Sequence, residues 1–187
     1  MRFVACLAGI LAIGGARVGR ADEGERVVVD GGLVMGLPAA LPTGLAVGVG
    51  AGVQTAGPLA WGVRASWSAA SESTLTWDVR HDDLRLRLTG AVQHDVGRGT
   101  LALRLGVGGN WVHETRTREQ GDRAGLTGDE LRTTAWSLLP AADVEVAVVV
   151  RVIGDFALAV SGGPSIDLLD GTPHVGWIGS LGVAWHD

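Results

Sequence analysis

Large apolar residues alternate with small or charged residues along most of this chain. In the segment 59–69, the odd positions hold Leu, Trp, Val, Ala, Trp and Ala, and the even positions hold Ala, Gly, Arg, Ser and Ser. Successive side chains of a β-strand point to opposite faces, so a period of two predicts strands with one apolar face. Eight such strands are predicted, at about 26–37, 44–55, 59–70, 73–95, 99–115, 131–150, 153–166 and 174–185.

The polar phase of these segments consists mainly of Gly, Ala and Ser, with a few charged residues. The chain has 30 glycines, and 47% of its residues are hydrophobic. Such a face suits the narrow interior of an eight-stranded barrel, where only modest side chains fit. We therefore expect an all-β fold, an eight-stranded antiparallel up-and-down transmembrane β-barrel with its apolar face toward lipid.

The seven tryptophans all fall on the apolar phase of their segments. Several lie near segment ends, where membrane barrels place aromatic girdles at the lipid interface. The predicted girdle comprises Trp61, Trp67, Trp77, Trp111, Trp136, Trp177 and Trp185.

The same alternation also fits a soluble periplasmic β-barrel or sandwich that buries its bulky residues and binds an apolar ligand inside. In that alternative the tryptophans form a core instead of a girdle. The direction of the tryptophan side chains distinguishes the two folds.

The first 21 residues have the pattern of a secretory signal peptide, and residues 22–187 form the predicted single barrel domain. Arg2 supplies the positive start, Val4–Ala16 is the apolar stretch, and small residues precede Asp22. The only cysteine, Cys6, lies in this segment, so the exported chain would carry no disulfide and no cysteine metal ligand.

The placement of turns predicts the topology. Short turns are expected near 55–58, 95–99 and 151–155, and longer polar loops at 114–130 and 167–174, which we expect to be extracellular. The apolar phase flips between Val79 and Leu84. We expect a β-bulge at His81-Asp82-Asp83; alternatively, His81-Asp82 is a hairpin tip and 26–37 lies outside the barrel.

Together, the leader, the alternation and the aromatic last segment VGWIGSLGVAW resemble small bacterial outer-membrane β-barrels of the OmpA/OmpX-like class. The resemblance covers about residues 26–185 and is one of pattern. It implies an outer-membrane location, a lipid bilayer as the surroundings, and the barrel assembly machinery as a partner. The implied role is structural, surface-interacting or weakly conducting.

Charged residues on the inward phase would form a network in the lumen, because a charge facing lipid is costly. The candidates are Asp30, Arg64, Asp78, Arg80, Arg85, Arg87, Arg104, Asp143 and Glu145. Strand alignment brings Arg104 near Asp143. Such a network would rigidify a plugged barrel, or alternatively line a narrow ion or proton path.

A third hypothesis is an enzyme at the outer rim, where His81, Asp82, Asp83, His113 and Glu114 could cluster. A shared proton relay would require both histidines within hydrogen-bond reach. No nucleophile is evident, so we expect no catalytic site, and no cofactor or metal. Asp167, Asp170 and His174 are expected in a solvated loop. The absence of a basic stripe argues against a nucleic-acid partner.

Overall fold

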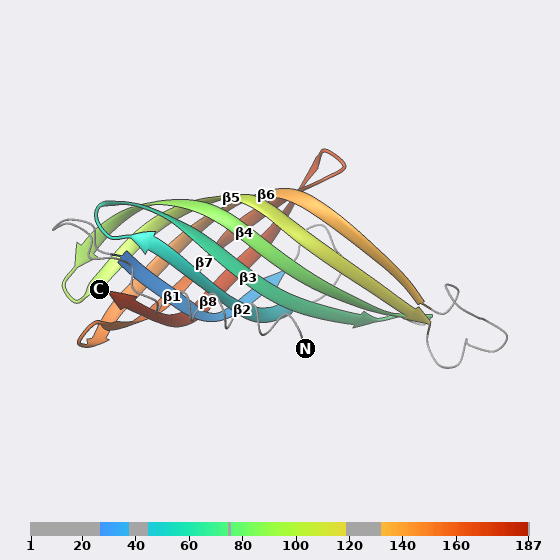
Figure 1. Cartoon of the computed structure of the whole chain (residues 1–187), viewed down its shortest axis with the longest axis horizontal. Coiled ribbons are helices and arrows are strands. Elements are labelled where there is room, and N and C mark those ends of the chain that lie inside the picture. The colour runs from blue at the N-terminus through green and yellow to red at the C-terminus, as the bar shows by residue number, and fades with distance from the viewer. Residues whose placement is uncertain (1–26, 38–44, 75, 119–131, 187) are drawn as a thin grey trace.

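The computed structural model describes residues 27–37, 45–74, 76–118 and 132–186, which form a closed antiparallel barrel (Figure 1). Its strands are β1 (Val27–Leu37), β2 (Ala46–Thr55), β3 (Leu59–Ser73), β4 (Trp77–Val96), β5 (Gly99–Arg118), β6 (Arg132–Ile153), β7 (Phe156–Leu169) and β8 (Thr172–His186). Each strand pairs with the next, and β8 pairs with β1. The predicted eight-stranded up-and-down barrel is confirmed. The expected signal segment and Cys6 lie outside the described residues.

The strands differ in length, so one end of the barrel is uneven. β1 and β2 have 11 and 10 residues, whereas β4, β5 and β6 have 20, 20 and 22. The long strands run well past the ends of β1 and β2 (Figure 1). We call this extension the projecting sheet; it comprises residues 70–73, 77–83, 112–118 and 132–137. The opposite end carries the tight β2–β3, β4–β5 and β6–β7 turns.

Large apolar side chains cover the outside of the barrel below the projecting sheet. Leu88, Val107 and Val160 are 64%, 59% and 53% exposed. The upper edge of this apolar belt is a register-aligned row, Trp67, Leu84, Trp111 and Leu138. On β5 the belt runs from Leu101 to Trp111, which fits the roughly 9–11 residues of a membrane-spanning strand. The belt is therefore a lipid-facing surface.

This orientation excludes the soluble alternative with an apolar interior. The buried side chains include Arg87, Arg104, Asp143 and Glu145, while the bulky apolar residues point away from the lumen. The part of the chain that the structure describes contains no helix long and apolar enough to cross a membrane.

The bulge expected at His81-Asp82-Asp83 is absent. β4 pairs with β3 without a register shift from Asp78 opposite Ser73 to Leu84 opposite Trp67. The hairpin tip lies instead at Thr74, whose hydroxyl accepts a hydrogen bond from the Trp77 amide at 3.0 Å. Residues 27–37 form the barrel strand β1 and β4 is one long strand, as the first alternative expects, and only its bulge is wrong. The second alternative, with a hairpin tip at His81-Asp82 and 26–37 outside the barrel, is wrong. Above the belt neither face of β4 contacts lipid, so its large apolar residues no longer have to lie on the outer face.

Two inward-facing glycines show how closely the strands approach one another. A Cβ at Gly48 would lie 1.8 Å from the carbonyl oxygen of Trp67, and one at Gly163 would lie 1.9 Å from that of Val144. Real Cβ atoms do not come this close to backbone, so these positions require glycine.

Candidate functional site: a charged lumen

An ion pair at the centre of the lumen joins two strands that are not neighbours. The Nε of Arg87 on β4 donates to Oδ2 of Asp143 on β6 at 2.5 Å. The remaining nitrogens of Arg87 donate to Asn110 Oδ1 at 2.6 Å and to the Gly109 carbonyl at 2.9 Å. Asn110 in turn donates to Asp167 Oδ1 at 2.7 Å, which extends the network to β7.

A second cluster links β1, β3, β5 and β6. Arg104 Nη1 donates to Glu145 Oε2 at 3.3 Å, and Arg64 lies 3.6 Å from both Glu145 and Asp30. The Ser161 hydroxyl also donates to Glu145, at 2.8 Å. Each of the two carboxylates lies near both arginines, which offsets part of the cost of burying charge.

A third ion pair lies toward the projecting sheet. Arg85 Nε donates to Asp83 Oδ2 at 2.6 Å, and both side chains are buried. Several buried polar atoms near these clusters have no hydrogen-bond partner among the described residues, among them Asp30 Oδ1, Asp83 Oδ1 and Arg104 Nε. Such atoms are normally satisfied by internal water.

Little free volume remains around these groups. Two cavities in the described lumen measure about 30 Å³ each, enough for a few water molecules at most. Toward the short-turn end, Val28, Ala157 and Ala184 pack together with Val149 and Ala159. These residues come from the adjacent strands β6, β7, β8 and β1, so they form an apolar cluster on one wall of the lumen.

The structure places seven of the nine predicted lumen charges on the inner face: Asp30, Arg64, Arg85, Arg87, Arg104, Asp143 and Glu145. Asp78 and Arg80 point outward instead, because β4 has no bulge to reverse its phase. Arg104 is opposite Glu145, not Asp143, because the true β5–β6 register is offset from the predicted alignment by two residues.

Sequence reasoning missed four members of the network: Asp83, Asn110, Ser161 and Asp167. All four lie on the inward phase of their strands, and this phase was the signal that could have identified them. The expected solvated loop at 167–174 was wrong. β7 continues to Leu169, Asp167 is 4% exposed, and a tight turn follows in which Asp170 and Gly171 have φ of 51° and 77°.

The five residues of the hypothetical rim enzyme separate onto two faces. His81 and Glu114 face inward, with His81 Nδ1 3.6 Å from Glu114 Oε2. His113 faces outward and stacks on Trp136, with ring centroids 4.2 Å apart. The two histidines therefore cannot share a proton. Among the described residues there is no group of three or more His, Cys, Asp or Glu suited to a metal ion.

The environment shifts the titration of two groups in the projecting sheet. Burial of the imidazole lowers the pKa of His81, and the negative charge of Glu114 partly opposes this shift. A hydrogen bond to Asp82 raises the pKa of Arg80 on the outer face.

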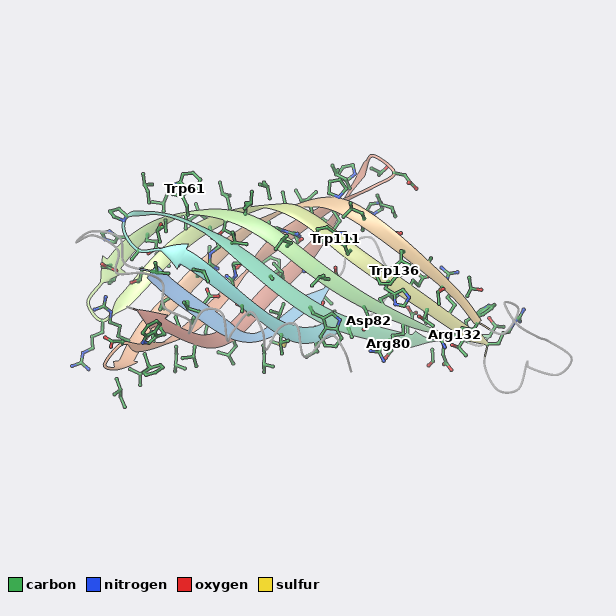
Figure 2. All side chains as sticks on the ribbon, viewed as in Figure 1. Trp61, Arg80, Asp82, Trp111, Arg132 and Trp136 are labelled. Atoms are coloured by element: carbon green, nitrogen blue, oxygen red, sulfur yellow. The ribbon has the colours of Figure 1, made fainter. Side chains whose placement is uncertain are left out.

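Six of the seven tryptophans lie on the outward phase, at both ends of the belt. Figure 2 shows Trp61 near the short-turn end, and Trp111 and Trp136 toward the projecting sheet. Trp77 is the exception. It lies on the inward phase above the belt, where the Arg118 guanidinium sits 4.8 Å from its ring centroid.

Neither the family models nor the curated proteins gave a match to this chain. Among solved structures, the barrel is similar to Neisserial surface protein A (NspA), with a TM-score of 0.52 and 11% identity over 89% of this chain and 98% of that one. It is also similar to Ail, the attachment invasion locus protein of Yersinia pestis (TM-score 0.51, 11% identity, 86% and 99% covered).

A third similar structure is a major outer membrane protein from Thermus thermophilus (TM-score 0.50, 13% identity, 87% and 98% covered). These likenesses concern the fold. The chain has the fold of small outer-membrane β-barrel proteins, and its exposed apolar belt is the surface that such a barrel presents to lipid.

Proposed function

We propose that this protein is an outer-membrane barrel with a closed lumen, which acts as a scaffold presenting the projecting sheet at the cell surface. The packing of the lumen carries this proposal. Buried ion pairs cross it at several levels, and the cavities between them hold only a few water molecules. A scaffold with a surface-interaction role fits this interior better than a channel or an enzyme does.

Opening an ion path would require the pairs to separate. Arg87 and Asp143 are each 4% exposed, and removing one partner from such a pair leaves an uncompensated buried charge.

The projecting sheet lies at the end opposite the short turns, which in this class of barrel is the extracellular end. Residues 134–138 of β6 extend beyond the last residues of β7, so the described part of β7 does not cover this edge. An uncovered strand edge can accept an extended segment of another protein. We propose this surface as the contact region for a partner.

Insertion by the barrel assembly machinery belongs to the same proposal. The last strand, β8, carries the outward-facing aromatic residues Trp177 and Trp185, which are 54% and 38% exposed. This pattern agrees with the aromatic C-terminal strand implied by the family resemblance.

Conductance measurements test the closed lumen. Refolded protein in planar bilayers should give no steady single-channel current in concentrated KCl. The double variant Ala157→Gly/Ala184→Gly removes two methyl groups from the apolar cluster on the lumen wall but keeps every ion pair, and should also stay closed. A stable open channel in the wild type would overturn the proposal.

A further inference from the structure

The end of the β7–β8 hairpin has few backbone connections to the rest of the barrel. We call residues 165–169 and 172–175 the hairpin tip; Figure 1 shows its turn standing clear of the other strands. Within the tip, β7 and β8 pair without interruption up to their turn. On the other side of β8, the described part of β1 ends at Leu37, opposite Trp177. Among the described strands, only β6 therefore supports the tip from the side.

The ladder that joins the hairpin tip to β6 is short. It consists of three residue pairs, formed by 141–143 of β6 and 165–167 of β7. Below them the ladder is interrupted, because residues 144–145 of β6 and 163–164 of β7 form no pair, although the register is the same on both sides of this gap. The other ladders between described strands have no such gap. The upper β6–β7 seam is thus separated from the rest of the wall.

A proline lies at each limit of this short ladder. Pro164 lies in the gap, and Pro140 lies where β6 would otherwise continue its pairing with Leu168. A proline has no backbone N–H and cannot donate a hydrogen bond to a neighbouring strand. Lipid offers no replacement for a missing backbone hydrogen bond, so the wall is locally weak at both positions.

Two glycines lie where the hairpin tip joins the barrel. Gly163 precedes Pro164 on β7, and Gly176 follows the tip on β8. Glycine tolerates wide changes of its backbone angles, so these positions can act as a hinge. The outward side chains of the tip are apolar, namely Ile166, Leu168 and Val175. The tip can therefore swing away from β6 without moving a charge on its outer face through lipid.

One side-chain hydrogen bond holds the hairpin tip from the lumen side. Asn110 Nδ2 donates to Asp167 Oδ1 at 2.7 Å, and Asn110 is itself fixed by Arg87, which donates to Asn110 Oδ1 at 2.6 Å. Among the described residues, no second side-chain hydrogen bond or ion pair joins the tip to the rest of the barrel. The Ser165 hydroxyl, opposite Asp143, has no hydrogen-bond partner among them. Asp167 therefore occupies the position of a latch.

From this arrangement we infer that the hairpin tip is a flap, which opens along the upper β6–β7 seam and is latched closed by Asp167 on Asn110. Opening breaks three backbone pairs and one buried side-chain hydrogen bond, and such local openings cost less free energy than global unfolding. The Arg104–Glu145 ion pair joins β5 to β6 and stays intact. The open flap uncovers the β6 edge down to Asp143, which lengthens the contact region proposed for a partner. This consequence rests on the proposed function, whereas the opening itself does not.

Hydrogen–deuterium exchange of the full chain, refolded in phosphatidylcholine vesicles, tests the flap. Amides donated across the upper seam, at 141–143 and 165–167, should exchange about ten-fold faster or more than those across the lower seam, at 146–150 and 158–162. Asp167→Ala removes the acceptor of the latch and should accelerate exchange in the upper seam by about a further ten-fold, the factor that one buried hydrogen bond contributes. Asp167→Asn keeps an acceptor oxygen and should stay closer to the wild type.

Ser161→Ala is the matched control. It also removes an inward hydrogen bond from β7, the one that Ser161 donates to Glu145 at 2.8 Å, but it does so below the gap. Exchange in the upper seam should therefore stay at the wild-type rate in this variant.

Disulfide bridges across the seam test whether the flap must move. Ala142→Cys/Ile166→Cys joins directly opposite residues of the upper seam, and Val148→Cys/Val160→Cys joins directly opposite residues of the lower seam; opposite Cα atoms in an antiparallel ladder are close enough for a bridge. Both pairs are made with Cys6→Ser, so that no other thiol competes. The upper bridge should abolish the acceleration caused by Asp167→Ala, and the lower bridge should not.

Equal exchange in the upper and lower seams of the wild type would overturn the flap. If Asp167→Ala accelerated exchange equally at residues 86–88 of β4, it would weaken the whole barrel, and Asp167 would not be a latch. The proposed closed lumen fails by a different result. A protected upper seam in a barrel without current loses the flap and keeps the closed scaffold, whereas a steady current in the wild type overturns the scaffold at any exchange rate of the seam.

Discussion

Arg87 on β4 and Asp143 on β6 form an ion pair across the intervening strand β5, 56 positions apart in the chain and 2.5 Å apart in space. The Arg87 side chain passes over Gly106: a Cβ on this glycine would lie 3.6 Å from the arginine's side-chain carbons. Small residues on the inner face of β5 thus allow charges on its two neighbours to meet.

This pair should contribute strongly to stability. We expect Asp143→Ala to lower the free energy of unfolding by about 3–5 kcal/mol, because it leaves Arg87 charged and buried without its partner. The double variant Arg87→Met/Asp143→Leu should regain most of this loss. Urea unfolding in lipid vesicles measures both.

A suitable control is Asp155→Ala in the exposed β6–β7 turn, which should change stability by less than about 0.5 kcal/mol. An Asp143→Ala variant as stable as this control would show that the lumen pair is not a structural constraint.

The close approach of β2 and β3 should make Gly48 intolerant of any side chain. Gly48→Ala would place its methyl group 1.8 Å from the Trp67 carbonyl oxygen, so we expect a loss of about 3 kcal/mol or more, or failure to fold. The matched control is Gly179→Ala, whose Cβ would meet only the Ser161 carbonyl, at 3.5 Å. Folding yield and urea midpoints distinguish the two variants, and equal behaviour would contradict the predicted strand contact.

A charge placed on the belt should report directly on contact with lipid. Leu88→Arg should destabilise the vesicle-embedded barrel by about 2–4 kcal/mol, since Leu88 is 64% exposed near the middle of the belt. Thr115→Arg, on the outer face of the projecting sheet, should cost about 1 kcal/mol or less. If Leu88→Arg were as mild as Thr115→Arg, the belt would face water.

His81 should make stability depend on pH below neutrality. Burial lowers its pKa in the folded state, so the unfolded chain binds this proton more readily. The unfolded form is therefore favoured as the pH falls below about 6.5, the ordinary histidine value, toward the lower folded value. At higher pH the group is neutral in both states and has no such effect.

The difference in unfolding free energy between wild type and His81→Gln, measured from pH 7.5 to 5, isolates this contribution. Wild type should lose stability relative to the variant as the pH falls. The exposed His94→Gln serves as the control. A wild type that gains stability over His81→Gln on acidification would show that the ion pair with Glu114 outweighs burial.

The sequence by itself determined the strands and, for most of them, the face on which each residue lies. Side chains of a strand alternate with a period of two, and the lipid-facing side must stay apolar, so Arg64, Arg104 and Glu145 were assigned inward without coordinates. The same rule failed for Asp78, Arg80 and Trp77, because above the belt no lipid constrains either face.

Only the tertiary structure decided which charges meet. Pairing depends on the register of two strands at once, and an offset of two residues preserves every face while changing every partner. Arg104 therefore lies opposite Glu145, and Asp143 binds Arg87 across a third strand. Alternation within single strands carries no information about such contacts, because they arise only when the sheet closes and brings distant strands around one narrow lumen.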